Sequence, residues 1–506
     1  MFWRENKTFK YEWINNYRSE GKFAFNFYFE IYFSFTIRPK MKQTIRLRMV
    51  SFFILLTATH FASAQGYQIK AKIEGIRDSS LILGHYSRSN TQFIPKDTAK
   101  ADAAGNITFE GSKNLAGGLY VILFPGNKKW IELVYSGKEN NIEISTDTTN
   151  VVGNMIIKKS DENQAFYTYQ KKLQTDSKKI QQLIDSKSPQ LAAQQNQMQQ
   201  DFKLYRSKFL KTNEALFVSK LLKMSADPDI PTAPTLPNGK SDSLWVYNYY
   251  KAHYWDNFDF SDGRILNTPF LEPKLDRYIK NLIPQTPDSL IVAADNLINR
   301  LPANSDIRKY VIFYITNQYE NPTTVGTEGL WVHMAKKYYL TEEMGVSNDI
   351  KKKIQEKVNT LQNLLVSKSF PALMLHLPDG QKQSVANLKG EYNVLFFYSP
   401  TCGHCKEAAP ELKAFYDKNK EVGVEVMAIS TETNKEEWKD FIIKYNFSEL
   451  KNGIDPTGQI DFYRTFDVVT TPTIYVLDKD KKIIARKLPI GQLDDFLNFY
   501  KNKIAK

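Results

Sequence analysis

The 506-residue chain shows three successive patterns of apolar and polar positions, and each predicts a different kind of domain. From Tyr67 to about Thr149, short runs alternate apolar with polar residues. Turn sequences such as Ala104-Gly105-Asn106 and Pro125-Gly126-Asn127 separate these runs. A period of two, interrupted by glycine and proline, is typical of β-strands. We therefore predict an all-β, sandwich-like domain over residues 65–150.

From about Asp161 to Ser367 the apolar period becomes that of helices. Apolar side chains such as Phe166, Tyr169 and Leu173 recur three or four positions apart among lysines and glutamines, which favours amphipathic helices. A proline-rich stretch divides this region at residues 228–237. We predict an all-α domain over residues 155–366, with helices that include 306–318, 327–339 and 348–365.

From Phe370 onward, strand patterns alternate with helix patterns. The pattern predicts helices at about 406–420, 435–445, 460–466 and 492–503, and strands at 372–377, 393–398, 424–430, 473–477 and 482–487. Such alternation favours parallel strands with helices on both faces, and Asp478-Lys-Asp-Lys predicts a closing antiparallel hairpin. The predicted fold is therefore multidomain, with a C-terminal α/β domain over residues 367–506.

Residues 41–64 have the composition of a secretory signal peptide. A basic start at Met41 leads to the apolar run 49–58, and Ala62-Ser63-Ala64 offers a small-residue cleavage site. The run is too short for a spanning helix, although an uncleaved anchor is an alternative. No cysteine follows the site, so we expect no lipid anchor. We predict export to the periplasm or cell envelope, and we interpret residues 1–40 as an extension upstream of a true start at Met41.

The net charge and the cysteine content limit the classes of function that the chain can have. Residues 1–64 carry +6 of the net charge of +13, and the remaining +7 is spread over 442 residues without aromatic stacking motifs, so we predict no nucleic-acid partner. The chain contains two cysteines, and both lie in Cys402-Gly403-His404-Cys405. An exported protein meets an oxidising compartment. With no further cysteines for structural disulfides, the pair is better explained as functional.

The cysteine pair follows a predicted strand and begins a predicted helix. Thiols at positions i and i+3 can close and reopen a small disulfide ring. Unpaired N–H groups at a helix N-terminus favour an anion, so Cys402 is expected to have a lowered pKa and to be the nucleophile. Cys405, one turn on, is expected to be the resolving thiol. A partly charged His404 imidazole would stabilise the Cys402 thiolate further.

Residues 370–506 resemble the thioredoxin-fold domain of exported thiol–disulfide oxidoreductases of the thioredoxin-like, AhpC/TSA-type family of Bacteroidota. Three segments carry the resemblance, in order and spacing: Phe370-Pro371 to Asp379-Gly380, Thr401 to Cys405, and Val469-Thr470-Thr471-Pro472-Thr473. The resemblance implies a cis Pro472 facing the cysteines, and a Thr471 backbone that pairs with an extended substrate strand.

The resemblance also implies partners and a redox range. Exported cysteine-containing proteins would be substrates, a membrane protein would supply electrons, and cytochrome c maturation is the usual setting of the relatives. Cys-Gly-His-Cys is the tetrapeptide of protein disulfide isomerase, whose potential is about −180 mV against about −270 mV for thioredoxin. His404 therefore favours oxidase or isomerase chemistry, whereas the relatives usually reduce, so the direction stays open.

The chain departs from the family at several positions. Phe396 stands where cytoplasmic thioredoxins bury an acid, and Ala408 stands where many exported relatives have a glutamate. The proton acceptor for Cys405 is therefore not identified, because Glu407 is expected to point to solvent. Thr401 replaces the usual tryptophan on the substrate-facing surface.

The front two-thirds of the chain resemble the N-terminal extensions of such exported proteins. His253-Tyr-Trp-Asp-Asn-Phe-Asp-Phe-Ser-Asp262 and Thr268-Pro-Phe270 match a recurrent motif without known chemistry. These domains are candidates for docking or for a dimer contact. His253 and His333 are expected to be packed or surface residues, because no second ligand has metal-site spacing.

Other interpretations of the cysteine motif are weaker. Haem attachment needs a histidine after the second cysteine, where Lys406 stands, and structural zinc needs four ligands. We therefore expect no metal and no organic cofactor. A thiol peroxidase is an alternative, although Pro400-Thr401-Cys402 has the wrong spacing for a peroxidatic cysteine. A partner-binding envelope protein with a secondary thiol function is the other alternative.

Overall fold

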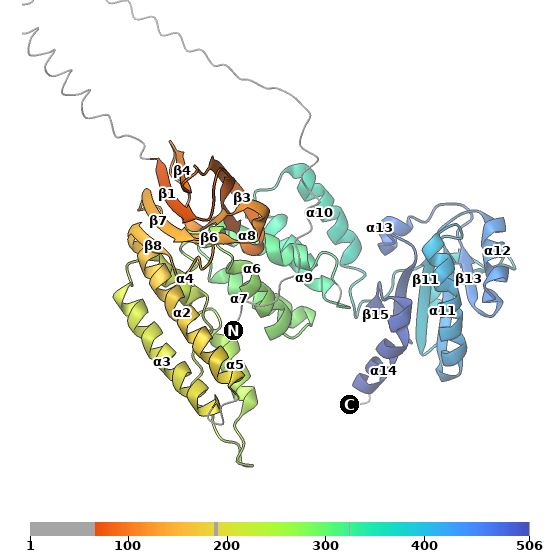
Figure 1. Cartoon of the computed structure of the whole chain (residues 1–506). Coiled ribbons are helices and arrows are strands. Elements are labelled where there is room, and N and C mark those ends of the chain that lie inside the picture. Colours follow the sequence, from red (N-terminus) through yellow and green to blue (C-terminus); the bar gives the residue numbers. More distant parts are fainter. Residues whose placement is uncertain (1–65, 187–190, 323, 505–506) are drawn as a thin grey trace, which may run out of the picture. The chain divides into compact units, whose positions relative to one another are not determined.

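The computed structural model describes residues 66–186, 191–322 and 324–504, shown in Figure 1. The predicted signal peptide (41–64) and the predicted upstream extension (1–40) lie outside these residues. Within the described ranges, no helix combines the length and the apolar character needed to cross a bilayer.

The β region consists of two four-stranded sheets, with strand orders β4-β1-β7-β8 and β3-β2-β5-β6. All neighbours are antiparallel except β1 and β7, which are parallel. Buried residues from both sheets, such as Ile69 and Tyr120, belong to one apolar cluster, which confirms the predicted sandwich-like class. The strands are β1 (Tyr67–Glu74), β2 (Ser80–Ser87), β3 (Ser89–Lys100), β4 (Asn106–Gly111), β5 (Gly118–Leu123), β6 (Trp130–Tyr135), β7 (Asn141–Asp147) and β8 (Ile156–Lys159).

Two of these strands depart from the sequence prediction. β3 is a long edge strand that pairs with β2. The sequence did not predict it because its residues are mostly polar and include Pro95, which an edge strand tolerates since one side stays in water. β8 lies inside the range 155–366 that was predicted to be helical. Its backbone pairs with β7, so the first helix begins only at Asp161.

The middle region is helical, as predicted. Its α-helices are α2 (Asp161–Asp185), α3 (Leu191–Thr212), α4 (Phe217–Met224), α5 (Ser243–His253), α6 (Leu271–Asp276), α7 (Pro287–Asn299), α8 (Asp306–Gln318), α9 (Glu328–Met334) and α10 (Asn348–Leu361). The predicted helix 327–339 is α9 followed by a π-helical turn at Ala335–Tyr339. Buried residues of this region, such as Val218 and Ile312, belong to the same apolar cluster as Ile69 and Tyr120 of the sheets. The β and helical regions therefore share one core.

The C-terminal domain is a seven-stranded sheet with strand order β10-β9-β13-β12-β11-β14-β15. β11, β12 and β13 are mutually parallel, and β14 and β15 form the predicted antiparallel hairpin. The strands are β9 (Met374–His376), β10 (Lys382–Ser384), β11 (Tyr392–Tyr398), β12 (Val424–Ser430), β13 (Lys451–Ile454), β14 (Thr473–Asp478) and β15 (Ile483–Arg486), and the helices are α11 (Gly403–Asn419), α12 (Lys435–Lys444), α13 (Phe462–Phe466) and α14 (Leu493–Ile504).

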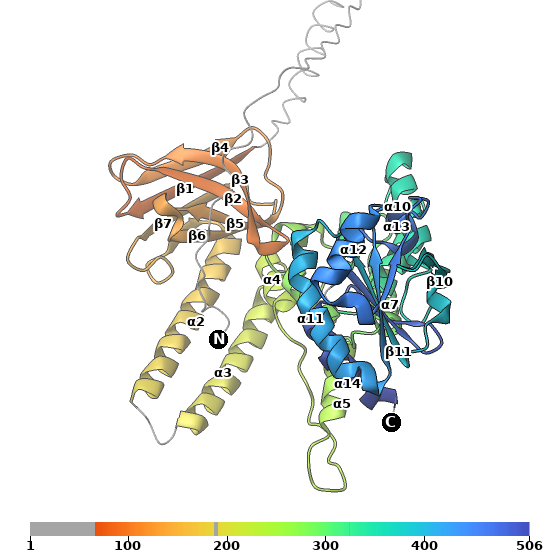
Figure 2. The ribbon, with the colours of Figure 1, turned by 90° about the vertical axis from the view of Figure 1, so that its right-hand side faces the viewer.

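The central strand β11 is buried on both faces. Val394, Phe396 and Tyr398 pack into one cluster with residues of α11, α12 and α14, which is the face seen in Figure 2. Leu395 and Phe397 pack into a second cluster on the opposite face. This continuous apolar run is expected for the central strand of a covered sheet, and the arrangement is a thioredoxin fold.

Asn163 joins the first turn of α2 to strand β6. The residue is fully buried, its Oδ1 accepts the Val134 N–H at 2.9 Å, and its Nδ2 donates to the Val134 carbonyl at 2.9 Å. One amide side chain thus replaces a missing strand partner, and it fixes the helical region to the sheet.

Replacing Asn163 with alanine should destabilise the chain strongly. The substitution leaves a buried N–H and a buried carbonyl of Val134 unpaired, at about 1–3 kcal/mol for each group. Urea denaturation followed by circular dichroism should show that the β and helical regions unfold at a lower urea concentration than in the unaltered chain. Gln164→Ala, on the exposed side of the same turn, is the matched control and should unfold like the unaltered chain.

Candidate active site

A tight turn at the end of β11 delivers Cys402 to the start of α11. The Cys402 N–H donates to the Ser399 carbonyl at 3.1 Å, and the Ser399 and Thr401 hydroxyls are hydrogen-bonded at 2.9 Å. Cys402 has extended backbone angles (φ −68°, ψ 126°) and is the N-cap residue of α11. Its side chain therefore folds back over the first turn of the helix, as N-cap side chains do.

Several hydrogen-bond donors lie beside the Cys402 sulfur. It accepts the backbone N–H of Cys405 at 3.4 Å. Partial burial raises the pKa of the Cys402 thiol, but hydrogen bonds from the side chains of Cys405 and Thr471 and from the backbone N–H groups of Cys405 and His404 outweigh burial. The net result is a pKa below the ordinary value, so the thiolate is favoured at this position.

Cys405 has the opposite environment. It is fully buried, whereas Cys402 is half-buried. Burial, followed by its interaction with the Cys402 sulfur, raises the pKa of the Cys405 thiol to about 11. The two cysteines are free thiols in this structure, and the expected division into an ionised, reachable sulfur and a protonated, inner sulfur agrees with their surroundings.

The loop before β14 faces Cys402. The Thr471–Pro472 peptide bond is cis, which confirms the prediction for this bond. The Cys402 thiol donates to the Thr471 carbonyl at 3.3 Å, and Thr473 Oγ1 donates to the Thr470 carbonyl at 2.6 Å. Thr471 and Pro472 are half-buried, and Thr401, the residue before Cys402, is exposed.

The sequence predicted that the His404 imidazole stabilises the Cys402 thiolate, and in the structure this imidazole faces solvent. The imidazole is 86% exposed and pairs with the Glu407 carboxylate at 3.3 Å. The part of His404 that favours the Cys402 thiolate is its backbone N–H. Glu407 points to solvent, with 79% of its side chain exposed, as the sequence predicted. Gly403 is the first residue of α11 and is exposed.

Cys405 lies among apolar side chains, in one cluster with Phe396, Tyr398, Ala409 and Leu412. Tyr398 is fully buried, including its hydroxyl. Burial, and then the neighbouring Cys405, raises the pKa of this hydroxyl. Sequence reasoning had used Tyr398 only as the end of a strand. The environment of Cys405 thus disfavours its ionisation.

His253 and His333, the two histidines that the sequence analysis considered as metal ligands, each have a carboxylate partner. His253 Nδ1 lies 2.6 Å from Asp256, and His333 Nε2 lies 3.0 Å from Asp295. Across the described ranges, no cluster of three or more His, Cys, Asp or Glu side chains is arranged to hold a metal ion.

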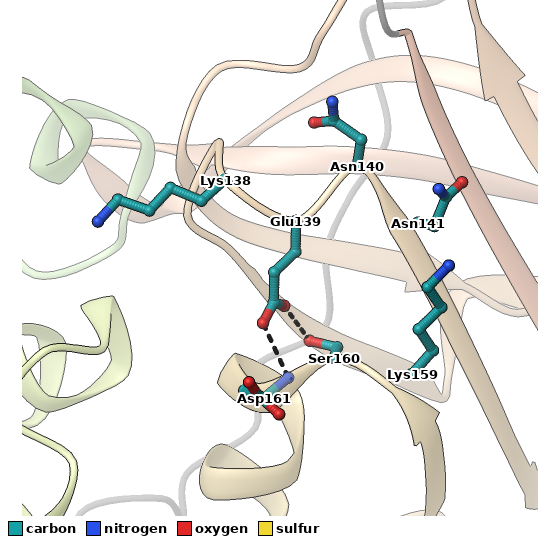
Figure 3. Close-up of a pocket in the computed structure, with 7 residues that line it drawn as sticks. All are labelled: Lys138, Glu139, Asn140, Asn141, Lys159, Ser160 and Asp161. Carbon is teal, nitrogen blue, oxygen red and sulfur yellow. Dashed lines mark hydrogen bonds between the residues drawn. The ribbon is translucent and has the colours of Figure 1, made fainter.

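An open polar depression lies on other elements, where the segment before β7 meets the start of α2 (Figure 3). There the Glu139 carboxylate accepts a hydrogen bond from Ser160 Oγ and, at 2.8 Å, from the Asp161 N–H. The carboxylate of Glu139 thus binds the N-terminus of α2, where an anionic ligand could otherwise bind. This depression carries none of the predicted site residues.

Fold and site together define a thioredoxin-like redox domain, and comparison with known proteins gives the same class. Residues 366–486 match the AhpC/TSA family, and residues 67–166 and 220–363 match two domains of unknown function, DUF4369 and DUF5106. The thiol-disulfide oxidoreductase ResA of Bacillus thuringiensis subsp. konkukian is 28% identical over 144 residues, which cover 28% of this chain and 81% of ResA. The sporulation thiol-disulfide oxidoreductase A of Bacillus subtilis is 26% identical over 113 residues, or 22% of this chain and 66% of that protein.

Solved structures include similar chains. A domain of a possible thiol-disulfide isomerase from Cytophaga hutchinsonii is 35% identical, with 28% of this chain and 96% of that chain covered and a TM-score of 0.27. A thioredoxin-like protein from Bacteroides caccae is 21% identical, with 54% and 99% covered and a TM-score of 0.43. On the family match over residues 366–486 and the curated relatives, the C-terminal domain is that of a thioredoxin-fold thiol–disulfide oxidoreductase, and further domains precede it.

The pH dependence of alkylation should separate the two thiols. In the reduced Cys405→Ser variant, whose hydroxyl can still donate to the sulfur, the rate of Cys402 alkylation by iodoacetamide should follow a pKa below that of cysteine in the urea-unfolded chain. In Cys402→Ser, Cys405 loses the neighbouring sulfur but stays buried, so its alkylation should still follow a pKa above that of cysteine in the unfolded chain. Mass spectrometry of quenched samples gives both rates, and equal midpoints for the two variants would contradict the assignment.

The lowered pKa of Cys402 has a consequence for stability. Because the folded value lies below the unfolded value, the thiolate stabilises the reduced fold fully above the unfolded pKa. That contribution disappears as the pH falls through the lowered folded pKa.

Proposed function

We propose that Cys402 and Cys405 are the redox pair through which the chain exchanges disulfides with exported proteins. The observation that supports this most is the position of the Cys402 sulfur, which accepts the Cys405 N–H and lies against the Thr471 carbonyl. Helix N-terminal N–H groups stabilise a thiolate, and the thiolate is the form that attacks a disulfide.

Reduction of a substrate would proceed in two exchanges. The Cys402 thiolate attacks one sulfur of the substrate disulfide, a mixed disulfide forms, and the other substrate sulfur leaves as a thiolate. Cys405 then gives its proton to water and attacks the Cys402 sulfur, which releases the second substrate thiolate. Two electrons pass to the substrate, and Cys402–Cys405 becomes a disulfide. The reverse sequence oxidises a substrate dithiol.

Thr471 and Pro472 would align the substrate. The half-buried loop faces the sulfur that reacts, and an extended substrate strand can pair with the backbone of Thr471. Thr401 would contact the same strand from the other side. Because Cys405 is buried and holds its proton, it would attack only after the mixed disulfide on Cys402 has formed.

The setting of the reaction is also a proposal. The relatives and the predicted signal segment support a periplasmic or envelope location, with exported cysteine-containing proteins as substrates. A membrane electron donor would reduce the pair if the chain acts as a reductase, in a role such as cytochrome c maturation.

The Cys405→Ser variant should trap substrates. Without the resolving sulfur, the mixed disulfide on Cys402 should persist, so non-reducing gels of cells that express the variant should show adducts that disappear with dithiothreitol. Mass spectrometry should locate the linkage on Cys402 and identify the attached proteins.

The control for this trap is the double variant Cys402→Ser, Cys405→Ser, which should capture nothing. In vitro, Cys402→Ser should reduce insulin at least about a thousandfold more slowly than the unaltered chain, as expected when a nucleophile is removed. Adducts that persist in the double variant, or insulin reduction that survives Cys402→Ser, would exclude the proposed pair.

The redox potential should lie nearer that of protein disulfide isomerase, about −180 mV, than that of thioredoxin, about −270 mV. Stabilisation of the Cys402 thiolate favours the dithiol form and makes the disulfide more oxidising. Equilibration with glutathione buffers, followed by thiol alkylation, measures the value. A potential near −270 mV or below would show that the helix N-terminus and the His404 position do not set the redox range.

A further inference from the structure

The helical region contacts the segment that leads into Pro472. Thr360 Oγ1 of α10 donates to the Arg464 carbonyl of α13 at 2.7 Å. Leu364, just after α10, is fully buried in one cluster with Phe466 and Val468. Two independent contacts therefore join the helical region to residues 464–468, which begin only a few positions before Thr471.

A buried ion cluster makes the third contact. The Arg486 side chain, at the end of β15, is 3% exposed, and its Nε lies 3.2 Å from Glu328 Oε1 at the start of α9. Its Nη2 pairs with Asp467 Oδ2, which also lies 2.7 Å from Lys487 Nζ. The cluster joins two cations to two carboxylates, so its formal charge is balanced.

Burial makes the members of this cluster depend on one another. The Glu328 side chain is 9% exposed and that of Asp467 is 12% exposed. A buried charge that loses its partner keeps the cost of desolvation without the compensating attraction. Arg486 therefore needs both carboxylates, and the place of Asp467 depends, through Arg486, on Glu328.

Asp467 is the residue at which the chain leaves α13 and turns toward Pro472. It has a left-handed backbone conformation, with φ +51°, which is uncommon for residues other than glycine. The preceding carbonyl, that of Phe466, accepts the buried Tyr475 hydroxyl at 2.6 Å. Four residues after Asp467, the Thr471 carbonyl accepts a hydrogen bond from the Cys402 thiol.

We propose that Glu328 is a positioning residue for disulfide exchange: the helical region holds the loop from Asp467 to Pro472 in place through Arg486. This inference rests on the proposed function. It assigns to the helical region a part in substrate recognition, because this region would hold the loop that aligns an extended polypeptide with the thiol pair. Glu328 acts through Arg486 and Asp467.

The test compares two disulfide substrates of the same chemistry on the reduced full chain. One is an extended hexapeptide whose single cysteine forms a mixed disulfide with thionitrobenzoate, and the other is the small reagent dithiobis(nitrobenzoate), which lacks a peptide backbone. Glu328→Gln should raise KM for the peptide about tenfold with kcat unchanged. Its rate with the small reagent should match that of the unaltered chain.

The matched control is Glu343→Gln, which breaks an ion pair with Arg308 inside the helical region and should leave both reactions unchanged. Thr360→Val, which removes the bond to Arg464, is the second variant and decides the question if Glu328→Gln does not fold. It should raise the peptide KM in the same direction.

The outcomes separate the inference from the function on which it rests. If the unaltered chain and Cys402→Ser release thionitrobenzoate from the peptide equally slowly, the proposed function fails. If the unaltered chain is active but folded Glu328→Gln and Thr360→Val behave like Glu343→Gln, the positioning role is overturned. Equal loss with both substrates would also overturn it, because that result indicates lost fold instead of lost alignment.

Discussion

The hydrogen bond from the Cys405 backbone N–H to the Cys402 sulfur is the contact on which the chemistry of the chain depends. It exists because Cys402 is the last residue before the first turn of α11 and has non-helical backbone angles. The start of that helix is fixed in turn by β11, which is buried on both faces. A shift of one residue in this strand would exchange its two apolar faces and move the sulfur away from the N–H groups.

The two sulfurs differ more in surroundings than in sequence. One lies among polar hydrogens and is reachable, and the other is enclosed by apolar side chains with a raised pKa. This difference gives the exchange an order, since the outer sulfur must react first. The family usually places an acid near the inner sulfur, but here Phe396 and Ala408 occupy those positions. Neither of these two side chains can accept the proton of Cys405, so Cys405 stays protonated more readily than Cys402.

Local patterns in the sequence predicted much of the C-terminal domain. The run 394–398 predicted a covered strand and the two cysteines predicted the helix start, because each property depends on neighbouring residues. The cis bond before Pro472 was implied by the resemblance to the family and not by the local sequence. β13 was missed, since Lys-Asn-Gly-Ile is short and half polar, and it is a strand only because β12 and β9 lie on either side.

The positions of individual side chains depend on contacts that no local pattern contains. The direction of the His404 imidazole follows from its pairing with Glu407. The ion pair between Glu328 and Arg486 joins residues 158 positions apart. Sequence reasoning could propose roles for residues beside the cysteines, but it offered no reason to connect α9 with the loop before β14.

The single core formed by the two sheets and the helices that follow them limits how this chain can be divided. A cut between residues 150 and 161 would separate β8 from its neighbour β7 and expose apolar surface on both pieces. The two stretches that match different domains of unknown function are therefore one folding unit. In a fusion or transplantation experiment they must be moved together, and a cut near residue 366, where the family match begins, would leave the buried Arg486 side chain without Glu328.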